Sequence, residues 1–218
     1  NEKAEIFCSF FRACAFKLEA ISLPLLNFIW RLKEKLTFKT DKKFQFQYVS
    51  TIQIEKKIKM LKKNKAVGID DLSPVLLKDC ASAISKPLGY IINMSIQTAT
   101  VPTEWKTAKI TPILKSGSPS ETDNYRPISI LPTLSKILEK IVHEQLSSYL
   151  EENKLLWNMQ FGYRTKRSTE GAITLFLDNI RKEVDTGKLV GVVFFDLSKA
   201  FDTISHNKLI NKLYTYGI

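Results

Sequence analysis

Apolar side chains recur at helical spacing along much of the chain. The first such pattern begins after Ser50, and Ser50 with Gln53 has the spacing of a capping box. Ser73 followed by Pro74 is typical of the start of a second helix. Further amphipathic patterns predict helices in the later stretches that begin at Pro87, run over 134–150 and 169–184, and follow His206.

Three shorter apolar runs have the composition of strands. Residues 106–115 and 125–131 flank the turn-rich sequence GSPSETDN, which predicts a projecting β-hairpin with basic residues. The run LVGVVFF at residues 189–195 is almost continuously apolar, which is typical of a strand buried on both faces. Helices and strands that follow one another in this way predict an α+β fold.

The net charge of the 218 residues is +11, and 44% of them are apolar. This composition is that of an ordinary globular domain, and the charge favours a polyanionic partner, most often nucleic acid. A basic ribosomal protein or a membrane-surface protein would carry the same charge. The three cysteines are an odd number without metal-ligand spacing, which argues against a disulfide scaffold and against a zinc site.

The region before Val49 has no pattern that identifies its role. Its apolar stretch at residues 6–30 is interrupted by charged residues and by Pro24, so we expect neither a membrane span nor a signal peptide there, and no membrane partner. We interpret residues 1–49 as an arm or linker. Because the chain begins with Asn1 and stops at Ile218 within a predicted helix, we expect it to be part of a longer polyprotein.

Asp196 directly follows the predicted buried strand. Burial disfavours a carboxylate unless a cation or hydrogen-bond donor compensates for the lost hydration, so this residue needs a partner. It is either a cap of the following turn or a ligand of a hard metal ion. Asp202 has the same two interpretations, as a second metal ligand or as a turn or cap residue.

The segment VVFFDLSKAFDTISHNKL, which contains Asp196, resembles the first catalytic motif of the reverse transcriptases of non-LTR (LINE-like) retrotransposons. Upstream segments resemble the successive blocks of the same domain in the same order: NKAVGIDDLSP, PTEWKTAKITPILKSG, NYRPISIL, LSKILEKIV and QFGYRTKRST. The resemblance extends from about residue 50 to residue 218 and is weak before Val49.

This resemblance implies a right-hand polymerase, with fingers at residues 50–167 and the start of the palm at residues 168–218. The implied activity is that of an RNA-directed DNA polymerase, whose partners are an RNA template, a DNA primer and an incoming deoxynucleoside triphosphate (dNTP). The reaction needs two divalent ions, expected to be Mg²⁺. An intracellular protein that acts in the nucleus is expected from the family.

The resemblance also assigns roles to individual residues. Asp196 and the backbone carbonyl of Leu197 would bind metal, and Phe201 would exclude the ribose 2′-hydroxyl. The remaining residues would contact the incoming dNTP through backbone amides at Lys199 and Ala200, or through side chains at Lys115, Arg126 and, less certainly, Lys109. The template-contacting residues would be Gln160, Gly162, Tyr163 and Arg164.

The chain departs from the family in one respect: the aromatic-x-Asp-Asp motif that carries the remaining metal-binding carboxylates does not occur in the 218 residues. We therefore expect the chain alone to be inactive as a polymerase. A non-catalytic nucleic-acid-binding remnant is one alternative. A group II intron-type reverse transcriptase is another, although the spacing of NYRPIS and the AFDT string favour the LINE-like family.

Overall fold

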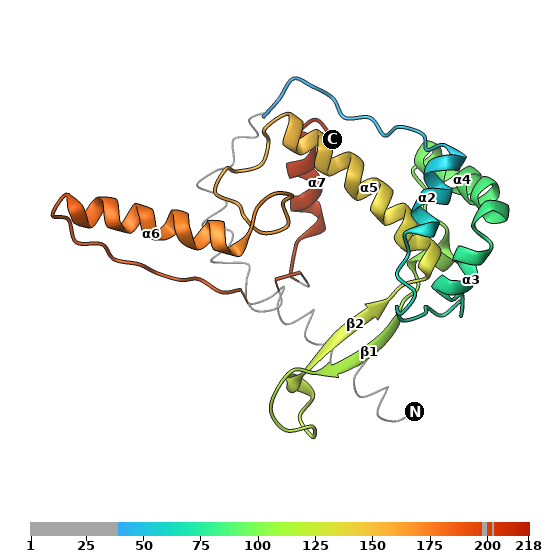
Figure 1. Ribbon diagram of the computed structural model, residues 1–218, viewed down its shortest axis with the longest axis horizontal. Helices are drawn as coiled ribbons and strands as arrows, with labels where there is room; N and C mark the ends of the chain where they lie inside the picture. Colours follow the sequence, from blue (N-terminus) through green and yellow to red (C-terminus); the bar gives the residue numbers. More distant parts are fainter. Residues whose placement is uncertain (1–38, 198–199, 202) are drawn as a thin grey trace. The chain divides into compact units, whose positions relative to one another are not determined.

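The computed structural model describes residues 39–197, 200–201 and 203–218. These residues form two compact units, and Figure 1 shows their helices and strands. The N-terminal unit is residues 44–148, and the C-terminal unit combines residues 39–43 with residues 149–218. The apolar stretch at residues 6–30, and most of the predicted arm, lie outside the described residues.

The N-terminal unit contains most of the predicted helices and the predicted hairpin. Its elements are α2 (Thr51–Lys59), α3 (Pro74–Asp79), α4 (Ala81–Thr98), the 3₁₀ helix η1 (Thr103–Lys106), β1 (Lys109–Leu114), the 3₁₀ helix η2 (Thr122–Asn124), β2 (Tyr125–Ile130) and most of α5 (Thr133–Glu152).

The predicted caps of α2 and α3 are confirmed. In α2 the Gln53 N–H donates to Ser50 Oγ over 3.3 Å, and the Ser50 N–H donates to Gln53 Oε1 over 2.9 Å. The Ser73 hydroxyl caps α3. The predicted start of α4 is wrong, because the helix begins at Ala81 and contains Pro87. Only Cys80 separates it from α3, and Cys80 makes no side-chain cap, so the sequence had no marker for this boundary.

The core of the N-terminal unit forms where α2, α3, α4 and α5 meet. Its fully buried members include Ile54, Ile58 and Ile92, and partly buried Trp105 packs against the same cluster. Two amide side chains attach the extended chain before α2 to this core. Asn93 of α4 accepts from the Val49 N–H and donates to the Val49 carbonyl, over 2.8 and 3.0 Å, and Gln145 of α5 does the same for Gln47 over the same distances.

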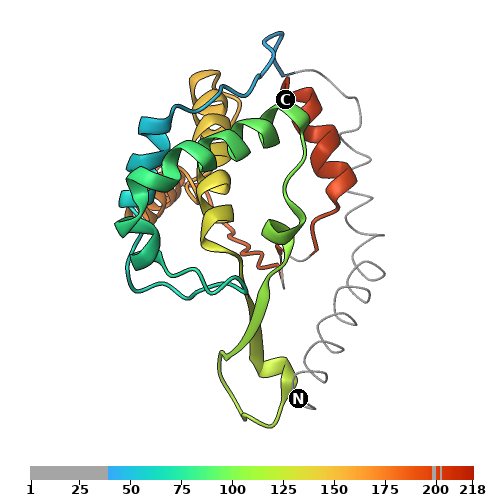
Figure 2. The ribbon, with the colours of Figure 1, turned by 90° about the vertical axis from the view of Figure 1, so that its right-hand side faces the viewer.

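The β1–β2 hairpin extends away from the helices of its unit (Figures 1 and 2). The strands are antiparallel, with Pro112 opposite Pro127. The Lys115 N–H donates to the Asn124 carbonyl over 2.7 Å, and hydrogen-bonded pairs recur every second residue along an antiparallel ladder. The two prolines therefore face each other at a non-hydrogen-bonded position, where a missing N–H costs no ladder bond.

The C-terminal unit contains the end of α5, α6 (Thr169–Asp185) and α7 (His206–Thr215), all at predicted positions. The Tyr149 hydroxyl lies 2.9 Å from the Lys42 carbonyl oxygen and 2.8 Å from that of Tyr216. The Lys39 N–H also donates to the Thr215 carbonyl over 2.9 Å. These contacts attach residues 39–43 to the end of α7. The division of the chain into fingers and palm at residue 168 stays a prediction.

Residues 189–195 do not form the predicted strand. They lie outside any helix or strand, and Phe194 and Phe195 are 83% and 90% exposed. In Figure 1 the segment runs back along α6, and the ring centroids of Phe194 and Phe176 are 5.8 Å apart. A strand is stabilised by hydrogen bonds to neighbouring strands, and the sheet within the described residues is the β1–β2 hairpin alone. The composition of a strand is not sufficient without a partner strand.

Candidate functional site

Three basic residues lie on one face of the hairpin. In the register, Lys109 is opposite Ile130 and Arg126 is opposite Ile113, and the hydrogen bond from Lys115 to Asn124 extends the same pairing by one residue beyond β1. Opposed residues share a face, and successive residues alternate between faces. Lys109, Lys115 and Arg126 therefore lie on the same face, which the sequence alone did not establish.

The three side chains on this face are free to bind a ligand. All three are exposed, and none forms an ion pair or side-chain hydrogen bond with the described residues. Gathering like charges on one narrow ribbon raises their mutual repulsion, and an anion relieves it. A lysine offers a point charge and an arginine a planar fork of donors, and both suit phosphate oxygens. We define these three residues as the hairpin basic face.

Asp196 and Leu197 are exposed, and the Asp196 carboxylate has no hydrogen bond or ion pair within the described chain. The expectation that burial forces a partner on Asp196 is thus wrong, because the strand before it is not formed. Lys199 and Asp202 lie outside the described residues. The carboxylate and carbonyl oxygens of Asp196 and Leu197 have the chemistry that Mg²⁺ prefers, but two donors do not complete a site. No cluster of three metal-ligating side chains occurs in the described chain.

Phe201 and Tyr163 contact each other, although 38 positions separate them in the sequence. Their ring centroids are 5.8 Å apart and the rings are nearly perpendicular, which is a favourable edge-to-face arrangement. Both side chains remain largely exposed, at 74% and 88%. The neighbouring Ala200 carbonyl accepts from the Thr203 hydroxyl over 3.2 Å. The structure thus brings a predicted dNTP-contacting residue against a predicted template-contacting residue.

Arg164 is held by an internal ion pair. Its Nε and Nη2 donate to the two carboxylate oxygens of Glu151 over 2.8 and 2.6 Å, and its Nη1 donates to the Trp157 carbonyl over 2.9 Å. Only 9% of the Arg164 side chain is exposed. The hydrogen bond from Arg164 lowers the pKa of Glu151, and the same bond raises the pKa of Arg164. This arrangement commits Arg164 to Glu151 and leaves little of its guanidinium for a template phosphate.

The rest of the predicted template-contacting loop is open. The Gln160 side chain donates to the Gly162 carbonyl over 3.2 Å. A Cβ added at Gly162 would have no atom within 4 Å, so the space around this residue is available to another molecule. Tyr163 has a left-handed backbone with a φ of 59°, and the Arg167 guanidinium lies 5.2 Å from the centre of the Phe161 ring. Tyr163 is the aromatic residue of this loop best placed to meet a base.

Comparison with known proteins assigns part of the chain to a family. The family described as "Reverse transcriptase (RNA-dependent DNA polymerase)" matches residues 113–218. That range contains Lys115 and Arg126 of the hairpin basic face and also contains Asp196. Residues 113–218 are part of a reverse transcriptase domain.

Relatives of this reverse transcriptase domain come from mobile elements. The "Probable RNA-directed DNA polymerase from transposon BS" of Drosophila melanogaster is 33% identical over 162 residues, which are 74% of this chain and 18% of that protein. The "RNA-directed DNA polymerase from mobile element jockey" of Drosophila funebris is 27% identical over 217 residues, which are 97% of this chain and 23% of that protein.

A third relative supports the same assignment. The Pol polyprotein of type-1 retrotransposable element R2 from Popillia japonica is 33% identical over 118 residues, which are 54% of this chain and 16% of that protein. The reverse transcriptase domain is thus of the LINE-like kind, and its family uses divalent metal ions. The chain spans about a fifth of the length of these relatives. Among the described residues, no helix is both long and apolar enough to cross a membrane.

Two features of the reverse transcriptase domain were missed by sequence reasoning. One is the role of Glu151 as the partner of Arg164. An acidic residue in the last turn of α5 opposes the helix dipole, and this anomaly was the available signal. The other is the pair of amide side chains, Asn93 and Gln145, that hold the chain before α2. An asparagine or glutamine on an amphipathic helix has no such signal, because its partner is distant backbone.

Proposed function

We propose that this chain supplies the fingers and the first palm motif of an RNA-directed DNA polymerase from a LINE-like mobile element. The observation that supports this function best is the hairpin basic face, which presents Lys109, Lys115 and Arg126 together and unpaired. Lys115 and Arg126 would bind the triphosphate of the incoming dNTP and hold its reactive phosphorus in line with the primer 3′-hydroxyl.

The palm motif would supply the metal-binding part of the site. Bound Mg²⁺ supplies charge neutralisation on the triphosphate and the departing pyrophosphate. Asp196 and the Leu197 carbonyl would hold the ion, together with carboxylates from a motif that the 218 residues do not contain. The backbone amides of Lys199 and Ala200 would donate to phosphate oxygens. In this arrangement residues 189–195 would pair with further palm strands, which would cover their apolar side chains.

Phe201 would select the sugar of the incoming nucleotide. Its ring would occupy the space that a ribose 2′-hydroxyl needs, so a deoxynucleotide would fit and a ribonucleotide would clash. Gln160, Gly162, Tyr163 and Arg164 would line the path of the RNA template, with Tyr163 stacking on a base. Because Arg164 is bound to Glu151, we assign it the role of shaping this loop.

The proposed division of labour follows the same reasoning. Residues 50–167 would be the fingers, residues 168–218 the start of the palm and residues 1–49 an arm. The RNA template and DNA primer would be the macromolecular partners, within a longer polyprotein that acts in the nucleus. The relatives named above come from transposons, which favours the LINE-like function over the group II intron alternative.

Primer extension tests this proposal. The polypeptide to assay is one that continues beyond Ile218 and includes an Asp-Asp motif, with an RNA template and a DNA primer. We expect extension with dNTPs, and no extension by the 218 residues alone. Asp196→Asn should lower the rate at least about a thousandfold while leaving template binding intact, because it removes charge without changing shape. Phe201→Val should admit ribonucleotides.

The outcomes separate the proposal from its rival. A longer polypeptide that binds template but never extends the primer would favour the non-catalytic nucleic-acid-binding remnant. That alternative is supported by the unpartnered Asp196 carboxylate and by the net charge of +11. If Asp196→Asn retained full activity, or if Phe201→Val still rejected ribonucleotides in an active enzyme, the corresponding residue assignment would be wrong.

A further inference from the structure

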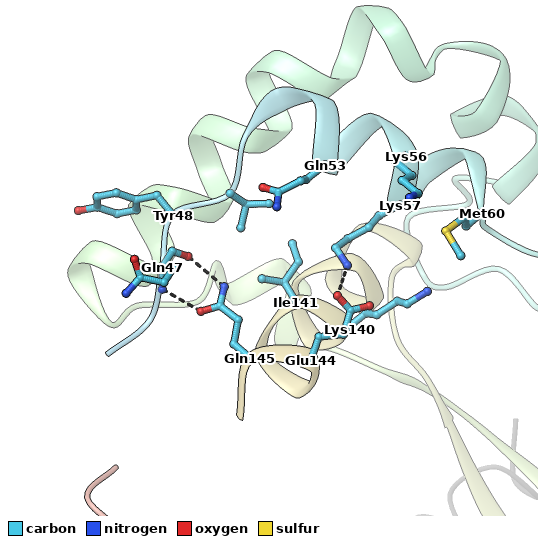
Figure 3. A pocket seen from close by; sticks show the side chains of 11 residues that line it. Gln47, Tyr48, Gln53, Lys56, Lys57, Met60, Lys140, Ile141, Glu144 and Gln145 are labelled. Carbon is cyan, nitrogen blue, oxygen red and sulfur yellow. Dashed lines mark hydrogen bonds and ion pairs between the residues drawn. The ribbon is translucent and has the colours of Figure 1, made fainter. Parts of the chain in front are cut away.

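A cavity in the N-terminal unit lies away from every residue assigned above (Figure 3). It has a volume of about 540 Å³, which is in the range of small-ligand sites. The cavity opens between α2 and α5, and the chain before α2 forms its remaining wall. Its lining residues are Gln47, Tyr48, Val49, Gln53, Lys56, Lys57, Met60, Lys140, Ile141, Glu144 and Gln145.

The wall of this cavity is held by internal bonds. The Gln145 amide bonds both the N–H and the carbonyl of Gln47, as the dashed lines in Figure 3 show. Lys57 pairs with Glu144 across the cavity, which joins α2 to α5. Val49 and Ile141 are buried members of the core, so the apolar part of the wall is rigid. The cavity is therefore preformed.

The polar groups left over in the cavity are all donors. Lys56 and Lys140 are exposed and form no ion pair with the described residues. The Gln53 Oε1 is occupied by the capping box of α2, whereas nothing in the described chain accepts from its Nε2. The carboxylate of Glu144 is neutralised by Lys57. A ligand that matches this lining carries acceptor oxygens and negative charge, as a phosphodiester does.

We propose that this cavity binds one unpaired nucleotide of a single-stranded nucleic acid, in addition to the polymerase site. Lys56 and Lys140 bind its phosphates, and the Gln53 Nε2 donates to an oxygen of the same strand. The base packs against Val49, Met60 and Ile141. A duplex keeps its bases stacked inside, so only an unpaired base reaches this apolar wall. The proposal rests on the proposed function only in expecting nucleic acid as a partner.

Oligonucleotide binding by the 218-residue chain tests the cavity. The probes are single-stranded RNA and DNA of one sequence and a fully paired RNA–DNA hybrid, with fluorescence anisotropy measured over a range of salt. We expect Lys56→Ala with Lys140→Ala to weaken single-strand binding roughly tenfold and to make the log–log salt slope shallower by about 1.4, or about 0.7 per phosphate contact. The control pair Lys86→Ala with Lys106→Ala removes the same charge elsewhere in this unit.

A second variant avoids any doubt about folding. Gln53→Glu keeps the acceptor oxygen that caps α2 and replaces the free donor with a negative charge. We expect it to weaken single-strand binding several-fold with no loss of helix content. Gln97→Glu makes the same change on the exposed surface of α4 and should have little effect.

The results distinguish this proposal from the proposed function. Loss of RNA binding alone would identify an RNA strand as the ligand, and equal loss for RNA and DNA would identify the phosphodiester of either. Equal effects of cavity and control variants would overturn the cavity while the polymerase proposal stands, as would an equal loss of binding to the paired hybrid. If the unaltered chain bound no oligonucleotide at low salt, both proposals would lose their nucleic-acid partner.

Discussion

The two units differ in how their apolar side chains are covered. Within the described chain, every buried apolar side chain lies between Val49 and Ile141, in the N-terminal unit. The C-terminal unit has equally clear apolar patterns, yet α6 buries no residue, and Phe194 and Phe195 are exposed. Apolar periodicity specifies which face of a helix seeks cover, but burial also requires a partner surface.

The contrast also separates stability from chemistry. The N-terminal unit combines a packed core with two ligand-binding features, the hairpin basic face and the cavity between α2 and α5. The C-terminal unit carries Asp196, Phe201 and Tyr163, which are exposed, and depends on a few polar contacts, such as those of Tyr149 and Arg164. Substitutions in the first unit should therefore act on stability, and those in the second mainly on function.

The largest expected effect is on the core. Ile92→Ala removes a side chain that is fully buried between α4 and its neighbours, so it should lower the free energy of unfolding by about 3 kcal/mol. Ile173→Ala makes the same change on α6, where the side chain is 53% exposed, and should cost less than about 0.5 kcal/mol. Urea unfolding followed by circular dichroism measures both. Equal losses would show that α6 is packed.

Next is a matched pair of glycines in the C-terminal unit. Gly187 and Gly217 have left-handed φ values of 81° and 79°. A Cβ at Gly187 would have no atom within 4 Å, whereas a Cβ at Gly217 would lie 2.0 Å from the Lys42 carbonyl oxygen. Gly187→Ala should cost about 1 kcal/mol of backbone strain, and Gly217→Ala roughly twice that or more.

Hydrogen exchange locates this effect. The Lys39 amide donates to the Thr215 carbonyl, so Gly217→Ala should speed its exchange by separating residues 39–43 from α7. Gly187→Ala should leave that amide unchanged. If the two variants lost the same stability and the Lys39 amide kept its protection, the contact between Gly217 and Lys42 would not be part of the folded unit.

A smaller effect is expected on the hairpin basic face. Lys115→Ala with Arg126→Ala should weaken binding of an RNA–DNA hybrid by roughly tenfold and make the salt slope shallower by about 1.8, or about 0.9 for each phosphate contact. Ser129→Ala alters the opposite face of the same hairpin and serves as the control. Binding titrations at several salt concentrations measure the slope. An unchanged slope would exclude phosphate contact by this face.

The smallest effect concerns the ion pair of Arg164 with Glu151. Because the folded-state pKa of Glu151 is lowered from 4.5, the stabilisation is complete above that pH and is lost as pH falls through the lower folded-state value. Arg164→Met should remove this part of the acid sensitivity. Arg181→Met, on the exposed surface of α6, should leave it intact. Thermal unfolding from neutral to acidic pH tests both, and identical acid profiles for all three proteins would contradict the prediction.

The candidate site was predictable to different degrees in the two units. Lys115 and Arg126 could be placed in a hairpin from sequence, because turn residues and β-branched residues act locally. Their common face needed the register, which the structure supplied. Arg164 was predicted to contact template, yet its guanidinium is bound to Glu151, and a basic loop sequence does not reveal such a distant partner.

The sequence by itself determined the local features of this protein. The capping box at Ser50, the cap at Ser73 and the paired prolines of the hairpin depend on neighbours along the chain or on backbone chemistry. Tertiary structure alone decided that residues 189–195 lack a strand, that Pro87 lies inside α4, and that Tyr163 contacts Phe201. The physical reason is that each of these outcomes depends on surfaces supplied by distant residues, and apolar composition does not specify which surface is present.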